Sequence, residues 1–184
     1  MKHRIDECFE QAGKEGRKVL IPFVTAGDPE PEYTVALMHA LVAGGADLLE
    51  LGIPFSDPMA DGPVIQASSE RAVSKGVGLE QVLEWVREFR RSDEKTPVVL
   101  MGYMNPFERF GYRQLAEETA SAGVDGLLLV DCPPEEMAGL QESLDEQGVY
   151  SVRLVAPTTT GARLKAIASA AQGFICLLYT SPSP

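Results

Sequence analysis

The chain has 184 residues, of which 45% are hydrophobic and 23% charged, and its formal net charge is −11. This length and composition are typical of one globular domain, and the acidic balance argues against binding to nucleic acid or to an anionic membrane. The three cysteines share no metal-ligand spacing, which indicates reduced thiols and no metal site. A charged N-terminal stretch and the lack of an apolar run near 20 residues predict a cytoplasmic protein without a membrane span.

Short apolar runs alternate with amphipathic segments along the whole chain. The apolar runs predict buried strands, and apolar positions at helical spacing predict helices. We expect strands at 19–24, 46–51, 96–101, 124–130, 149–155 and 174–179. We expect helices at 2–13, 31–43, 64–74, 79–90, 112–122, 135–147 and 161–171, with an exit loop at 102–107 after the third strand.

This alternation predicts an α/β fold with a parallel sheet. Polar residues gather where predicted strands end, namely Glu50, Asp61, Tyr103, Asn105 and Asp131. A (β/α)₈ barrel places its active site at that end of the strands, and an open doubly wound sheet also binds ligands there. Periodicity alone leaves both architectures open, although the lack of a G-x-G-x-x-G pattern weakens a dinucleotide-binding interpretation.

Glu50 interrupts an apolar strand, and Asp61 lies in the Pro- and Asp-rich loop that follows. A buried carboxylate is costly without a partner or a chemical role, so the two acids are a candidate acid–base pair. Two structural explanations remain open from spacing alone. Glu50 would then pair with a helix N-terminus or a lysine, and Asp61 would be an ordinary turn residue.

Five segments together closely resemble the tryptophan synthase alpha chain family. The most specific is the segment around the two acids, and the others follow the first, third, fourth and fifth predicted strands in the family's order. The segments are LELGIPFSDPMADGPVIQ, IPFVTAGDP, MGYMNPFERFG, DGLLLVDCPPEE and LVAPTTT.

The resemblance implies a TIM barrel and a retro-aldol cleavage of indole-3-glycerol phosphate to indole and glyceraldehyde 3-phosphate. It implies that Glu50 protonates indole C3 and removes the side-chain hydroxyl proton, helped by a pKa raised by burial. Asp61 would remain ionised and hold the indole N–H. The chain itself would need no cofactor, because pyridoxal phosphate belongs to the beta subunit with which the family forms an α₂β₂ complex.

The same resemblance assigns two further groups of residues. Residues at strand ends would line the indole pocket: Phe23, Met101, Tyr103, Leu128, Val130 and Leu154. Residues in the loops after the second and third strands would meet the beta subunit: Asp57, Asn105 and Pro106. Ordinary core packing for the first group, and solvated turns for the second, are the alternatives.

The resemblance covers residues 1–175, a partial barrel with six of eight strand–helix units, and fails near Cys176, where the family has a tyrosine. We expect residues 176–184 to be a disordered tail foreign to the family, because Ser-Pro repeats do not continue a helix. A complete barrel needs about 250 residues and builds its phosphate site after the last strands. We therefore expect little activity from these 184 residues alone. The competing hypotheses are a non-catalytic fragment that docks on the beta subunit and another phosphate-handling barrel, which the acidic motif disfavours.

Overall fold

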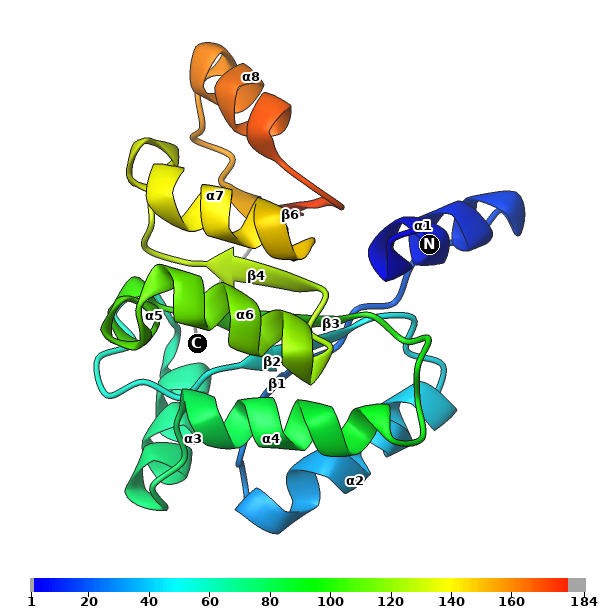
Figure 1. The fold of residues 1–184 in the computed structure, drawn as a ribbon, viewed down its shortest axis with the longest axis vertical. Coiled ribbons are helices and arrows are strands. Elements are labelled where there is room, and N and C mark those ends of the chain that lie inside the picture. Colours follow the sequence, from blue (N-terminus) through cyan, green and yellow to red (C-terminus); the bar gives the residue numbers. More distant parts are fainter. Residues whose placement is uncertain (1, 179–184) are drawn as a thin grey trace.

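The computed structural model describes residues 2–178, and within them six parallel strands form one curved sheet (Figure 1). The strands are β1 (Phe23–Thr25), β2 (Leu49–Gly52), β3 (Val98–Gly102), β4 (Gly126–Leu129), β5 (Tyr150–Val155) and β6 (Ile175–Leu177). Each strand pairs with the next one along the chain, so the strand order never reverses. A doubly wound sheet contains such a reversal, whereas a TIM barrel does not. The predicted barrel architecture is therefore confirmed.

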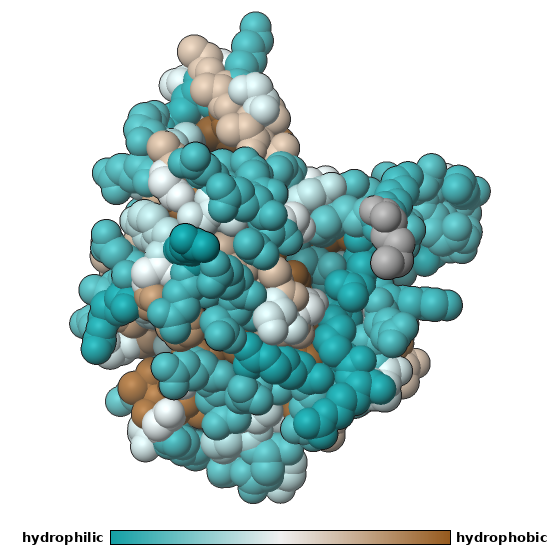
Figure 2. Space-filling view, in the orientation of Figure 1, coloured by the Kyte–Doolittle hydropathy of each residue, from teal (hydrophilic) through white to brown (hydrophobic). Residues whose placement is uncertain are grey.

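Helices connect the strands and cover the outside of the sheet. They are α1 (Arg4–Lys14), α2 (Thr34–Ala43), α3 (Pro63–Ser74), α4 (Leu79–Arg90), α5 (Met104–Phe110), α6 (Tyr112–Ala122), α7 (Ala138–Gln147) and α8 (Gly161–Ala170). Short 3₁₀ turns at Pro31–Tyr33 and Pro134–Glu136 precede α2 and α7. The surface over α4, α6 and α7 is mostly hydrophilic, as expected for the solvent side of these helices (Figure 2). Helices α4 and α6 have the predicted bounds.

The sheet has two apolar faces because side chains alternate along each strand. Leu49 and Leu51 of β2 belong to the larger cluster, which the sheet forms with the covering helices. Leu48 belongs to a second cluster on the opposite face, which we call the inner cluster. Its buried members are Ile5, Leu48, Val99, Leu128 and Val152, and its partly buried members include Met101, Val130, Leu154 and Cys176. The inner cluster is the interior of the barrel.

Helix α1 lies against the start of the strands and closes that end of the inner cluster. Ile5 is fully buried there. Arg4 Nη1 donates to Asp125 Oδ1 at 3.0 Å, just before β4, and the Tyr150 hydroxyl donates to Asp6 Oδ2 at 2.8 Å. The ring of His3 stacks on Tyr150 with centroids 3.4 Å apart. The N-terminal helix is thus fastened to β4 and β5.

The expected exit loop at 102–107 is wrong, because helix α5 begins at Met104. Pro106 is the third residue of this helix, where its missing N–H has no intrahelical partner in any case. The free amide of Met104 donates to Asp131 Oδ1 at 2.7 Å. That cap comes from the end of β4, so the local sequence does not reveal it.

The ends of the sheet also differ from the prediction. The first expected strand spans 19–24, but β1 covers only Phe23–Thr25. Before it, the carbonyls of Leu20 and Pro22 still accept from the amides of Asp47 and Glu50 at 2.9 and 3.0 Å. Proline has no amide to complete the ladder at that point. At the other end, β6 includes residues 176–177, which were expected to belong to the disordered tail. Residues 179–184 of that tail lie outside the described part of the chain.

Candidate active site

Glu50 is held in the barrel interior by the register of β2. It pairs with Phe23 of β1 on one side and Val99 of β3 on the other. Because it lies two residues from Leu48, its side chain shares the face of the inner cluster. The same alternation that sends Leu49 and Leu51 to the helices therefore aims the carboxylate into the barrel.

Burial is the dominant electrostatic influence on Glu50. It raises the pKa of the carboxyl group from 4.5 to about 7. Within residues 2–178 no hydrogen bond or ion pair to its side chain offsets this effect, which argues against a lysine or helix N-terminus as its structural partner. The carboxylate also raises the pKa of the nearby Cys176 thiol, after the larger effect of burial. A carboxyl group with a pKa near 7 both donates and accepts a proton near neutral pH.

Asp61 lies in the loop between β2 and α3, where Tyr103 holds it. The Tyr103 hydroxyl donates to Asp61 Oδ2 at 3.0 Å and accepts from the Ala60 amide at 2.9 Å. Burial raises the pKa of Asp61, and the Tyr103 hydrogen bond opposes that rise. Burial also raises the pKa of Tyr103 to about 12, so the phenol remains a donor at neutral pH.

The acidic loop itself is folded back onto α3 by polar side chains. Gln66 Nε2 donates to the Asp61 carbonyl at 2.9 Å. The Ser69 hydroxyl accepts from the Phe55 amide at 2.9 Å and donates to the Phe55 carbonyl at 3.0 Å. The ring of Phe55 also packs on Tyr103, with centroids 5.4 Å apart. These contacts fix the position of the Asp61 carboxylate.

A small cavity brings several of the predicted site residues together. Its lining includes Phe23, Asp61, Met101, Tyr103 and Val130, which come from β1, the ends of β3 and β4, and the acidic loop. Leu128 is fully buried in the inner cluster rather than in the wall of this cavity. Leu154 shares the inner cluster but borders a different cavity, between β5 and α8. Direct contact of these residues with a ligand remains a prediction.

The sequence did not single out several other residues of this cavity, among them Thr25, Gly52, Ile65 and Ser69. Gly52 has a steric reason to be glycine, because a Cβ there would lie 2.6 Å from an atom of the Phe23 ring. Ser69 is one helix turn beyond Ile65 on α3, and its hydroxyl forms hydrogen bonds with the backbone of Phe55 in the acidic loop. The sequence signal for Ile65 and Ser69 is their four-residue spacing, which places them on one face of the helix directly after the acidic loop.

The residues assigned to a partner interface lie on the outside of the molecule. Asp57 and Asn105 are exposed, and Pro106 is half-buried at the start of α5. Ser56 donates to Asp57 Oδ2 at 2.5 Å, and the neighbouring Met59 is 85% exposed. This surface is available to a partner, and its role remains a prediction.

Two other features bear on the class of protein. Among residues 2–178 there is no group of three His, Cys, Asp or Glu side chains placed to hold a metal ion. In the same part of the chain no helix has the length and apolar character needed to cross a membrane.

Comparison with solved structures shows the same fold. The tryptophan synthase alpha subunit of Legionella pneumophila str. Paris superposes with a TM-score of 0.92 at 49% identity, over 96% of this chain and 68% of that one. A chain of the tryptophan synthase complex from Pyrococcus furiosus superposes with a TM-score of 0.82 at 44% identity, over 86% of this chain and 65% of that one.

Sequence comparisons agree. The tryptophan synthase alpha chain of Laribacter hongkongensis is 60% identical over 173 residues, and that of Cupriavidus taiwanensis is 58% identical over 172 residues. The matches cover 94% of this chain but only 66% and 65% of these curated relatives, so the chain spans about two thirds of their length. The family model of the tryptophan synthase alpha chain matches residues 9–181. The chain therefore belongs to the tryptophan synthase alpha chain family.

Proposed function

We propose that this chain is the catalytic part of a lyase of tryptophan biosynthesis that cleaves indole-3-glycerol phosphate to indole and glyceraldehyde 3-phosphate. The observation that carries the proposal is Glu50, a carboxyl group inside the barrel whose pKa burial raises to about 7. Membership of the family supports it independently. General acid–base catalysis is worth roughly 10²- to 10⁴-fold in rate.

Glu50 and Asp61 have different roles in the proposed reaction. Protonated Glu50 delivers its proton to indole C3, and Asp61 accepts a hydrogen bond from the indole N–H as positive charge develops on the ring. The Glu50 carboxylate then takes the proton of the adjacent side-chain hydroxyl. The C–C bond breaks, its electron pair restores the aromatic ring, the hydroxyl carbon becomes an aldehyde, and Glu50 is again protonated. No cofactor enters these steps.

Tyr103 favours the ionised state that the proposed mechanism requires of Asp61. Its hydrogen bond to Oδ2 opposes the rise in the Asp61 pKa that burial causes, and so favours the ionised form of the acid. The phenol also fixes the loop through the Ala60 amide. We therefore assign Tyr103 a positioning role toward Asp61.

Glu50→Gln and Asp61→Asn test the assignment. Because the chain spans about two thirds of its relatives, the test uses it joined after β6 to the remaining segment of the Laribacter hongkongensis protein. Both substitutions should abolish indole release while circular dichroism remains unchanged. Glu88→Gln, on the exposed side of α4, is the matched control and should retain activity. Near-normal turnover in either acid variant would sink the proposal.

We further propose that the exposed surface at Asp57, Asn105 and Pro106 meets a beta subunit, with which the protein forms an α₂β₂ complex. The solved relative from Pyrococcus furiosus is a tryptophan synthase complex, which supports a partner. Asp57→Arg should reduce co-purification with a tryptophan synthase beta subunit, whereas Glu117→Arg on α6 should not. Co-purification without any indole production by the joined chain would instead favour a docking protein without catalysis.

A further inference from the structure

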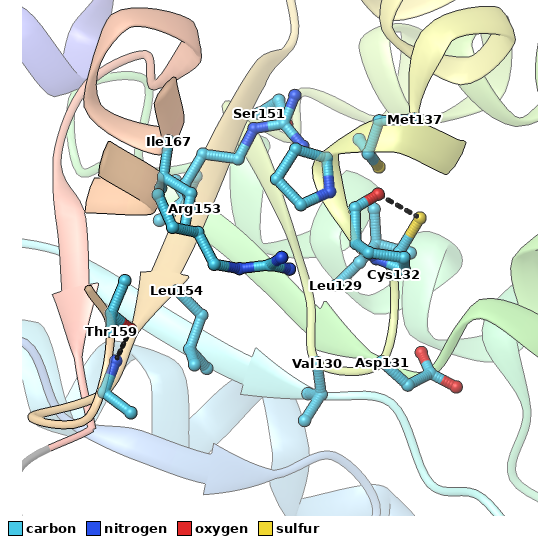
Figure 3. Close-up of a pocket in the computed structure, with 15 residues that line it drawn as sticks. Leu129, Val130, Asp131, Cys132, Met137, Ser151, Arg153, Leu154, Thr159 and Ile167 are labelled. Atoms are coloured by element: carbon cyan, nitrogen blue, oxygen red, sulfur yellow. Dashed lines mark hydrogen bonds between the residues drawn. The ribbon is translucent and has the colours of Figure 1, made fainter. Parts of the chain in front are cut away.

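A second cavity, of about 320 Å³, opens between the ends of β4 and β5, the 3₁₀ turn before α7, and α8 (Figure 3). Apolar side chains of Leu129, Met137 and Ile167 line it together with two arginines, Arg153 and Arg163. Arg153 alternates along β5 with Val152 and Leu154, which belong to the inner cluster. Its side chain therefore leaves the sheet on the helix side, away from Glu50.

Arg153 is a buried cation with an incomplete set of partners. The residue is only 7% exposed. Its Nη2 donates to Gln141 Oε1, a neutral amide, at 2.6 Å, whereas its Nε–H has no hydrogen-bond partner within residues 2–178. The buried hydroxyl of Ser151 in the same lining also lacks one there. Buried polar groups are normally satisfied, and a buried guanidinium normally has a counter-charge.

The carboxylates around the cavity accept hydrogen bonds from groups other than Arg153. Asp131 accepts from the Met104 amide, and its carboxylate lies at the edge of the cavity, away from Arg153 (Figure 3). Asp145 Oδ1 accepts from Gln141 and Gln172. Within the described residues, none of these carboxylates forms an ion pair with Arg153.

Burial lowers the pKa of Arg153, and Asp145 opposes this effect through space without forming an ion pair. Burial raises the pKa of the Cys132 thiol, so this lining residue is neutral at pH 7. Across the cavity, Arg163 lies 3.8 Å from Glu135 in an exposed pair, which leaves its guanidinium free to turn inward. Two cations thus border one cavity whose lining carboxylate, Asp131, points away from Arg153, and water would satisfy the Nε–H without balancing the charge.

We propose that this cavity binds a small organic carboxylate, whose charged group pairs with Arg153 and Arg163 and whose apolar body packs on Met137 and Ile167. The planar guanidinium matches carboxylate geometry, and a charge-assisted hydrogen bond is stronger than a neutral one. The volume and the apolar lining select a molecule of several carbons over a bare ion. Arg153 leaves the sheet on the opposite face from Glu50, although Val130 borders both cavities.

The test follows the Arg153 Nε–H resonance in proton–nitrogen spectra of the ¹⁵N-labelled 184-residue chain. 3-Phenylpropionate should shift this resonance saturably, because the proton gains its missing acceptor. 3-Phenylpropanol has the same body without the charge and should leave the resonance in place. Inorganic phosphate has the charge without the body and should bind at least about tenfold more weakly. Phosphate binding as tight as that of phenylpropionate would overturn the proposed ligand class.

Substitutions locate the site. Arg163→Gln, on the exposed side of α8, should weaken phenylpropionate binding by about tenfold, which is about 1.4 kcal/mol. Arg153→Met keeps the length of the buried stem and should abolish binding. Arg113→Gln, on the exposed surface of α6, is the control and should bind as the parent does. Failure to shift the Arg153 resonance, or unchanged affinity in Arg163→Gln, refutes the site even if Arg153→Met does not fold.

Discussion

Replacing Glu50 by glutamine should make the protein more stable at neutral and alkaline pH, by an amount that disappears in acid. Below pH 4.5 the carboxyl group is neutral in both the folded and the unfolded chain, so its burial costs little. As the pH rises, the unfolded chain ionises first, near 4.5, whereas the folded chain ionises only near its raised pKa of about 7. Stability therefore falls between these two values and then levels off.

The size of this loss follows from the same two values. The gap between 4.5 and about 7, at about 1.4 kcal/mol per pH unit, corresponds to about 3 kcal/mol. Because Glu50 retains some contact with solvent, we expect about 2–3 kcal/mol. Glutamine is neutral throughout and escapes the penalty. The protein thus holds this buried acid at a cost in folding stability, as proteins commonly do at functional sites.

Urea unfolding of the 184-residue chain at pH values from 4 to 8 measures the effect. The difference in unfolding free energy between Glu50→Gln and the parent should be near zero at pH 4 and rise to its full value by pH 8. Glu88→Gln, on the exposed face of α4, should show no such trend. A difference that does not change with pH, or a Glu50→Gln chain less stable than its parent at pH 8, refutes the electrostatic argument.

Three further perturbations test other parts of the structure. Asp125→Ala should destabilise the chain by about 3–5 kcal/mol in urea unfolding, because it leaves two arginines and the Val98 amide without their buried acceptor. Gly52→Ala should lower the stability by about 1–3 kcal/mol, because its Cβ would lie 2.6 Å from the Phe23 ring; an unchanged unfolding midpoint would show that the ring moves aside. Tyr103→Phe should raise the pKa of Asp61 in a carboxyl ¹³C titration, because the hydrogen bond that opposes burial is lost; an unchanged titration would remove Tyr103 from its positioning role.

Local patterns were sufficient for much of this fold. Helix α4 was predicted to the residue because apolar side chains recur at helical spacing between Gly78 and the charged segment after Arg90. Glu50 was identified because a carboxylate stands out in an apolar strand, and burial has the predicted effect on its pKa. The choice between barrel and doubly wound sheet needed the strand order, which periodicity does not contain.

Features that depend on contacts distant in sequence could not be predicted. The start of α5 depends on Asp131 capping Met104 from another strand end, so the segment resembled a loop. Within residues 2–178 the Nε–H of Arg153 has no partner, which depends on its surroundings, because the sequence shows only an arginine in an apolar strand. The same holds for Gly52, whose missing side chain matters only once Phe23 lies across from it.

The fastening of α1 to β4 and β5 has a consequence for how the chain folds during synthesis. Arg4 and Asp6 find their partners at Asp125 and Tyr150, which are 121 and 144 residues further along the chain. The ribosome therefore releases α1 long before the strands that bury Ile5 exist. Until then this helix lacks part of the surface that it covers, and an isolated helix of eleven residues is marginal in water. This helix is made well before β4 and β5 but is secured only after them, so its docking reports that the sheet has assembled as far as β5.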